Sequence, residues 1–201
     1  MKLYYLPGAC SLASHIALQE TKLPFDIDKL TAATMTTSNG TDFTKINAKG
    51  YVPTLELNDG SILTEGSAVL QYIADQSPNS GLAPKAGTTE RYRLQEWLNY
   101  IATEIHKSYS PLFSKTTPEE TKTTVRNTLA KRLGFVEEQL AYKPYLMGEN
   151  FTVADAYLYV VLNWSGRVGF DLGQFPKISE YVARLSVRPS VVAAMKAEGL
   201  L

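Results

Sequence analysis

The strongest constraint on the fold is the order of elements at the start of the chain. Residues 2–6 are rich in β-formers and end at Pro7-Gly8, which indicates a strand followed by a turn. Apolar residues then recur at roughly helical spacing over residues 11–21, and residues 25–28 alternate as a strand does. Two strands joined through a helix pair in parallel by a right-handed crossover. We therefore expect a parallel βαβ unit here.

A second set of elements follows residues 31–41, a Thr- and Ser-rich stretch that we expect to be an exposed loop. Residues 51–57 and 61–64 are short apolar segments on either side of Asn58-Asp59-Gly60. Asp-Gly between two such segments is a strong hairpin signal, because both residues tolerate positive φ. A helix follows from about residue 66 to 74. The order β-α-β and then β-β-α is that of a thioredoxin-like domain.

The second half of the chain is expected to be helical. Residues 77–87 are dense in Pro, Gly and Ser, which marks a linker. The sequence then predicts one long helix over residues 90–113 and further helices that begin at Pro118 and Thr152 and near residues 178 and 190. We therefore expect an α/β thioredoxin-like N-terminal domain (βαβ-ββα) at residues 1–80, a linker at 81–88 and an all-α helical C-terminal domain at 89–201.

Composition argues against several classes of partner. The chain has 20 Lys and Arg against 20 Asp and Glu, and a nucleic-acid binder needs a basic footprint. No segment reaches the length of a membrane span, and the N-terminus carries no apolar signal core. Cys10 is the one cysteine, so no internal disulfide can form. We expect no nucleic-acid or membrane partner, and a cytoplasmic setting.

Cys10 is the leading candidate for a reactive residue. It lies where the first expected strand gives way to the first helix, so its sulfur faces the unpaired N–H groups and the positive end of the helix dipole. Both effects lower the pKa of the thiol and favour the thiolate. A lone cysteine is otherwise a small buried apolar residue, and the helix-start position is what favours reactivity here.

Two further motifs suit a peptide-like ligand. Val52 precedes Pro53 at the start of the third strand, where a cis proline would turn the Val52 backbone toward an extended ligand. Glu65 and Gly66 precede the next helix, whose first N–H groups suit a carboxylate while Glu65 suits an ammonium group. The Glu65 carboxylate and these N–H groups together fit a free α-amino acid end, which carries both charges. An ordinary strand-opening proline and a simple helix cap are the alternatives.

The long helix carries two faces, of which the apolar one is expected to face the core. The apolar face, at three- and four-residue steps, comprises Leu94, Trp97, Leu98, Ile101 and Ile105. The polar stripe comprises Asn99, Thr103, His106, Lys107 and Ser110. That stripe is either a solvated face or part of an anion or thiol site, in which His106 can exchange a proton near neutral pH.

The remaining histidine and the aromatic residues have competing interpretations. His15 falls inside the first expected helix, where a packing or backbone-bonding role is expected. Two histidines and one cysteine, far apart, show no metal-ligand spacing, so we expect no metal. Tyr109, Phe113 and Trp164 are candidates for the wall of a site for an apolar electrophile, and core packing is the alternative for each.

Six motifs are spread along the whole chain. They are Tyr4-Tyr5-x-Pro7-Gly8-x-Cys10-Ser11, Gly50-Tyr51-Val52-Pro53, Leu63-Thr64-Glu65-Gly66, Glu96-Trp97-Leu98-Asn99, His106-Lys107 and Phe151-Thr152-Val153-Ala154-Asp155. In their order and spacing they resemble bacterial beta-class glutathione S-transferases from end to end. The resemblance implies a glutathione site in the first domain, a hydrophobic electrophile site shared with the second domain, and a homodimer.

The resemblance also implies roles for single residues. Cys10 would face the glutathione sulfur, Val52 beside Pro53 would contact the cysteinyl unit, and Glu65 with Gly66 would hold the γ-glutamyl end. Other positions expected around glutathione are Ser11, Asn99, Thr103, Glu104, Ile105, His106 and Lys107, with Cys10 and His106 as the catalytic pair. The chain departs from the pattern at Met35, where relatives often carry a ligand-contacting lysine, and Gly66 replaces a serine of other transferase classes.

The expected function is therefore the conjugation of glutathione thiolate to small hydrophobic electrophiles, as in detoxification, with glutathione as co-substrate. Glutathione-dependent disulfide exchange or peroxide reduction through Cys10 is the first alternative. A non-catalytic scaffold that binds apolar ligands or a protein is the second.

Overall fold

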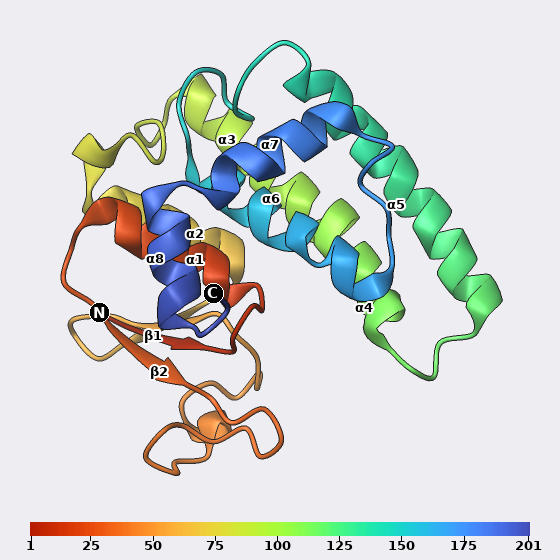
Figure 1. Cartoon of the computed structure of the whole chain (residues 1–201). Coiled ribbons are helices and arrows are strands. Elements are labelled where there is room, and N and C mark those ends of the chain that lie inside the picture. Colours follow the sequence, from red (N-terminus) through yellow and green to blue (C-terminus); the bar gives the residue numbers. More distant parts are fainter. The chain divides into compact units, whose positions relative to one another are not determined.

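The computed structural model describes the whole chain, residues 1–201. It divides into two compact units, of which unit 1 comprises residues 1–83 and 188–201 and unit 2 comprises residues 84–187. The expected division differs at the C-terminus, because the last segment groups with unit 1 rather than with the helical unit. The reason is α8 (Pro189–Ala197), which packs against α1 (Ser11–Thr21), as Figure 1 shows.

Unit 1 is built on a four-stranded mixed sheet in the order β2-β1-β3-β4. The strands are β1 (Lys2–Tyr5), β2 (Asp26–Lys29), β3 (Thr54–Glu56) and β4 (Ile62–Thr64). β1 pairs in parallel with β2, which confirms the βαβ unit, and antiparallel with β3, which forms the expected hairpin with β4. The thioredoxin-like order is confirmed.

The helices of unit 1 bury their apolar faces against this sheet and each other. α1 packs against α2 (Gly66–Gln76), and single 3₁₀ turns lie at η1 (Phe43–Lys45) and η2 (Pro78–Ser80). Leu3, Ile16 and Leu55 are completely buried. Burial of one such side chain contributes about 1.5–3 kcal/mol, so these residues fix the sheet and helix that carry Cys10.

Unit 2 is entirely helical. Its elements are α3 (Thr89–Tyr100), η3 (Ile101–His106), α4 (Lys107–Phe113), α5 (Glu119–Leu140), α6 (Val153–Asn163), η4 (Ser165–Val168) and α7 (Pro176–Ser186). All residues of α6 from Val153 to Leu162 are buried, so this apolar helix forms the centre of the unit. A capping box lies at its start, with reciprocal bonds between Thr152 and Asp155.

The expected single α-helix over residues 90–113 is interrupted by η3, a π-helical turn. In a π turn each hydrogen bond joins residues five apart rather than four. The side chains before and after the turn are therefore offset from α-helical spacing. The apolar face is buried as expected, with Leu94, Ile101 and Ile105 each 0% exposed. The π turn ends at His106, and such turns are frequent at functional sites.

Candidate active site

The candidate site residues fall in both units, and unit 1 holds Cys10. This residue is half-buried at the N-cap of α1, and its sulfur donates a hydrogen bond to the carbonyl oxygen of Val52 at 3.2 Å. The fold thus brings together two expected site residues that lie 42 positions apart. Because the bond uses the thiol proton, it favours the protonated sulfur and opposes the pull of the helix start toward thiolate.

The Val52–Pro53 peptide bond is cis, as expected from the motif. Val52 lies in a buried apolar cluster with Tyr4, Leu30 and Phe43, and the side chain of Met35 packs against that cluster. Met35, at the position where the resemblance leads us to expect a lysine, therefore makes an apolar contact with the cluster that contains Val52.

Glu65 has an unusual backbone and two polar neighbours. Its φ is 70°, a left-handed value that is uncommon outside glycine, and it is the N-cap of α2. Its Oε1 accepts hydrogen bonds from the Lys49 ammonium at 2.6 Å and the Tyr51 hydroxyl at 2.8 Å. These bonds to Glu65 raise the pKa of Lys49 and of Tyr51. Strained residues gather at functional sites, which supports Glu65 as a ligand contact.

Sequence reasoning missed Lys49 and Tyr51 as neighbours of Glu65. The Lys49 ammonium also donates to the Thr64 hydroxyl at 2.9 Å, so one cation spans two residues before α2. The position of Tyr51 directly before Val52 was the only signal in the sequence. Gly66 opens α2, and a Cβ at this position would lie 3.8 Å from the Pro53 ring, an ordinary contact.

The Ser11 hydroxyl has a structural role. The Ser11 side chain is completely buried, and its hydroxyl bonds both the N–H and the carbonyl of Leu6 at 3.3 Å. The hydroxyl therefore closes the loop between β1 and α1 and is not presented to a ligand.

A buried network joins that loop to the C-terminal segment. The Glu198 carboxylate accepts a hydrogen bond from the Gly8 N–H at 2.9 Å and lies 3.0 Å from His15 Nδ1. The side chains of His15 and Glu198 are at most 1% exposed. The His15 ring also packs against Tyr5 and Phe25, so His15 is a structural residue, as expected. Glu198 was missed because nothing local links it to Gly8.

Unit 2 holds His106 at the end of the π turn. Its Nδ1 lies 2.6 Å from the Tyr157 hydroxyl, and its ring lies 4.8 Å from that of Trp164. Burial, with a smaller contribution from the cation of Lys107, lowers the pKa of His106 to about 4. The expectation of a histidine that titrates near neutrality is therefore wrong, because the surrounding rings exclude the water that would solvate a charged imidazole.

Trp164 is the centre of an aromatic cluster that also contains the other expected electrophile residues. Tyr109 and Phe113 lie 5.8 and 5.7 Å from the Trp164 ring. Phe113 is 47% exposed, whereas Tyr109 is completely buried. The Tyr109 hydroxyl bonds Ser165 at 2.7 Å, and burial raises the pKa of Tyr109 to about 12. Tyr109 is thus a core residue and corrects the expectation that it lines a wall.

The other polar positions of unit 2 differ in accessibility. Asn99, Thr103 and Lys107 are exposed, and the Thr103 hydroxyl donates to the Asn99 carbonyl at 3.0 Å. Glu104 forms a 2.7 Å ion pair with Arg132 of α5. Ile105 is completely buried, so its side chain packs in the core.

No three His, Cys, Asp or Glu side chains gather in a way that could hold a metal ion. Nor does any helix combine the length and the apolar character required to cross a bilayer.

Comparison with known proteins decides the family. Residues 8–76 match the family model described as glutathione S-transferase, N-terminal domain, and residues 100–189 match that of the C-terminal domain. The chain is 46% identical over 200 residues to glutathione S-transferase GstA of Escherichia coli O157:H7, with 100% of both chains covered. The chain belongs to the glutathione S-transferase family. Its enzyme class and its co-substrate glutathione are those expected from the sequence.

Two solved structures refine the assignment of this transferase. A bacterial beta class glutathione S-transferase from Sphingomonas chungbukensis has a TM-score of 0.96 and 46% identity, with 100% of both chains covered. A sphingomonad glutathione S-transferase complexed with glutathione has a TM-score of 0.96 and 45% identity over the same full coverage. The beta-class resemblance of the motifs is confirmed.

Proposed function

We propose that this transferase binds glutathione along Cys10, Val52 and Glu65 of unit 1 and joins its sulfur to small hydrophobic electrophiles. The observation that carries the proposal is the 3.2 Å hydrogen bond from the Cys10 sulfur to the Val52 carbonyl. It places the one cysteine beside a backbone group that can pair with a peptide. The relative crystallised with glutathione supports the choice of ligand.

Glutathione binding and the state of Cys10 are coupled in this proposal. An extended peptide that pairs with Val52 donates its own N–H to the Val52 carbonyl, which is the acceptor of the Cys10 thiol. The ligand therefore displaces the thiol from its acceptor. The released sulfur then lies at the start of α1, which favours the thiolate and its interaction with the glutathione thiol.

The γ-glutamyl end fits the start of α2. Its ammonium group joins the Lys49 ammonium and Tyr51 hydroxyl at the Glu65 carboxylate. Its carboxylate meets the first N–H groups of α2, at Gly66 and the residues that follow. Because the two charged groups sit on one carbon atom, Lys49 lies close enough to pair with that carboxylate. Lys49 then supplies a cation to the ligand in a chain that has Met35 in place of the family lysine.

In the reaction, the bound glutathione thiolate attacks the electrophilic carbon and expels a leaving group such as halide. We assign the apolar body of the electrophile to the exposed edge of the aromatic cluster in unit 2, where Phe113 adjoins Trp164. His106 has a pKa of about 4 and is a weak base. We therefore assign it a hydrogen-bonding role beside Tyr157 rather than that of a general base.

Disulfide exchange is a second candidate function, favoured by the partial exposure of Cys10. The Cys10 thiolate attacks a glutathione mixed disulfide, takes the glutathionyl group and releases the other thiolate. Free glutathione then attacks this new disulfide, restores the Cys10 thiolate and leaves as oxidised glutathione. Because the chain has no second cysteine, free glutathione must complete the cycle.

We also propose that the enzyme acts as a homodimer in the cytoplasm, that residues 1–80 form its glutathione domain and that its electrophile domain lies within residues 89–187. Family membership supports the dimer, and a single thiol without a disulfide partner suits a reducing compartment. Sedimentation of the purified protein tests the dimer directly.

The test compares the wild type with Cys10→Ala and Glu65→Gln, and with Glu149→Gln as an exposed control. Calorimetry measures glutathione affinity, and chlorodinitrobenzene conjugation and mixed-disulfide reduction measure the two activities. Loss of one charge-assisted contact in Glu65→Gln weakens glutathione binding by about tenfold or more. Cys10→Ala abolishes disulfide reduction. A wild type that binds no glutathione and conjugates nothing contradicts the proposal, as does unchanged affinity in Glu65→Gln.

A further inference from the structure

Tyr157 of α6 holds one nitrogen of the His106 ring. Its hydroxyl lies 2.6 Å from His106 Nδ1, and the two rings meet edge-on with centroids 5.8 Å apart. Both residues lie in unit 2, where the π turn that ends at His106 packs against α6. Tyr157 is 4% exposed, because α6 is buried along its length. The hydroxyl is therefore a fixed point to which the imidazole is tied.

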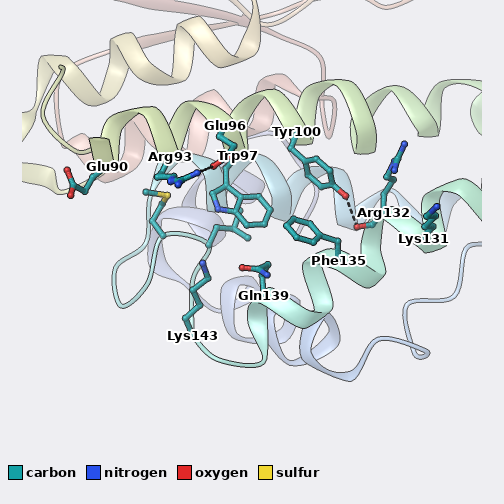
Figure 2. A pocket seen from close by; sticks show the side chains of 12 residues that line it. Glu90, Arg93, Glu96, Trp97, Tyr100, Lys131, Arg132, Phe135, Gln139 and Lys143 are labelled. Carbon is teal, nitrogen blue, oxygen red and sulfur yellow. Dashed lines mark hydrogen bonds and ion pairs between the residues drawn. The ribbon is translucent and has the colours of Figure 1, made fainter. Parts of the chain in front are cut away.

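Other tyrosine hydroxyls of unit 2 bond groups that hold the helices together. Tyr100 donates to the Arg132 carbonyl at 3.0 Å and so joins α3 to α5, as Figure 2 shows. Tyr109 pairs with Ser165 at 2.7 Å. The Tyr157 hydroxyl is the one in the chain that lies at an imidazole nitrogen. Its partner, unlike theirs, can act on a ligand.

The hydrogen bond decides which nitrogen of His106 carries the proton. Burial keeps the ring neutral, since it lowers the pKa of His106 to about 4. A neutral imidazole has one N–H and one bare nitrogen, and the partner of one nitrogen fixes the state of the other. A phenol, with a pKa of about 10, gives up its proton more readily than an imidazole N–H, so the phenol is the better donor. Tyr157 therefore donates to Nδ1, and the imidazole proton lies on Nε2.

The Nε2 atom of His106 is open to a ligand. It has no hydrogen-bond partner in the protein, and it is not enclosed as the unpartnered Nε2 of His15 is. The His106 ring is half-buried and lies 4.8 Å from that of Trp164. Trp164 adjoins the exposed Phe113, where we place the electrophile. The imidazole is therefore a neighbour of the proposed electrophile position.

We propose that Tyr157 is a positioning residue of the conjugation reaction: it donates to His106 Nδ1, holds the imidazole proton on Nε2 and so presents this N–H to negative charge that develops on the electrophile. The inference rests on the proposed conjugation function. When glutathione thiolate adds to a chloronitroarene, the C–S bond forms and an electron pair moves onto the nitro oxygens, from which it returns to expel chloride. The Nε2–H stabilises that charge as a hydrogen-bond donor and keeps its proton throughout.

Nitrogen NMR of the free enzyme, carrying isotopically labelled histidine, tests the position of the proton. The chain has two histidines, so the signals of His106 are those absent from His106→Gln. At neutral pH we expect a protonated Nε2 and a bare Nδ1, whose resonance moves further downfield in Tyr157→Phe because its hydrogen bond is lost. A proton on Nδ1, or an Nδ1 resonance that is the same in both proteins, overturns the proposal. Tyr159→Phe removes another buried hydroxyl from α6 and should leave these signals and kcat unchanged.

The kinetics of chlorodinitrobenzene conjugation test whether Tyr157 acts through His106. Tyr157→Phe should lower kcat by about five- to tenfold, in line with loss of one hydrogen bond, and leave the glutathione KM within about twofold. The amide of His106→Gln can place an N–H near the position of Nε2 but offers no acceptor at that of Nδ1. Adding Tyr157→Phe to His106→Gln should therefore change kcat by less than about twofold. Equal losses in the two backgrounds, or an unchanged kcat in Tyr157→Phe alone, overturn the proposal.

The two measurements also separate this inference from the proposed function. A wild type that conjugates nothing refutes the proposed function and the inference with it. An active wild type that has its proton on Nδ1, or that shows additive losses, refutes the inference alone. If Tyr157→Phe does not fold, as its melting transition would show, the wild-type spectrum still decides the position of the proton.

Discussion

Replacement of Glu198 by alanine tests the buried network that ties the C-terminal segment to the loop before Cys10. The carboxylate is removed from water and contacts the Gly8 N–H at 2.9 Å and His15 Nδ1 at 3.0 Å. Glu198→Ala leaves both groups buried without that partner. Each orphaned polar group costs about 1–3 kcal/mol, and breaking a buried pair by removal of one member costs about 3–5 kcal/mol. We expect a loss of about 3 kcal/mol in the free energy of unfolding.

Scanning calorimetry measures this loss. For a chain of this length, 1 kcal/mol corresponds to roughly 2–4 °C in Tm, so we expect a decrease of about 6–12 °C. Glu198→Gln retains an acceptor and is expected to lose less. The control is Glu149→Ala, an exposed carboxylate expected to change stability by less than about 0.5 kcal/mol. If Glu198→Ala and Glu149→Ala melt within about 2 °C of each other, the network does not stabilise unit 1.

Three further predictions concern unit 2 and the γ-glutamyl contacts. Burial lowers the pKa of His106 from its ordinary 6.5 to about 4. Between pH 4 and 6.5 the imidazole is therefore protonated in the unfolded chain and neutral in the folded chain. The contribution of His106 to the free energy of unfolding is therefore complete above pH 6.5 and is lost, by about 3 kcal/mol, as the pH falls toward 4. Urea unfolding of His106→Gln should lack this pH-dependent loss. A pH dependence equal to that of the wild type would refute it. Asp155 accepts hydrogen bonds from Leu146 N–H, Thr152 N–H and Oγ1, and Tyr181 Oη, so Asp155→Ala should cost about 3 kcal/mol rather than the ~1 kcal/mol of a simple cap. Conjugation by the folded fraction should stay near normal, and loss of turnover at unchanged Tm would contradict this structural role. Lys49→Met should raise the glutathione KM by about fivefold with kcat unchanged, and an unchanged KM would exclude Lys49 from the ligand contacts.

Much of the fold follows from local patterns in the sequence. The Pro7-Gly8 turn, the Asp59-Gly60 hairpin and the linker before α3 mark element boundaries, because the residues there tolerate or require special backbone angles. The π turn Ile101–His106 was not predicted. A 3.6-residue period fits both flanking helices, and a single register shift of one residue leaves most apolar positions still buried.

The sequence points to candidate site residues where a motif is contiguous, and it misses contacts that join distant residues. Each contiguous motif lies just before a helix or strand, where backbone groups are free to bind a ligand. The residues concerned are Cys10, Val52 and Glu65. Lys49 pairs with Glu65 across 16 residues, and His15 meets Glu198 across 183. Such pairs depend on the folded chain. The burial of the Ser11 and Tyr109 side chains was not predicted, because spacing alone does not show which side of an element is covered.

Spectroscopic titration of the Cys10 sulfur tests the central claim most directly. The thiolate absorbance of the wild type, with that of Cys10→Ser subtracted, is followed at neutral pH while S-methylglutathione, which has no thiol of its own, is added to saturation. We expect the thiolate fraction of Cys10 to rise with ligand occupancy, because the ligand takes the Val52 carbonyl from the thiol. A constant or falling thiolate signal at saturation would contradict the account, and so would the absence of binding.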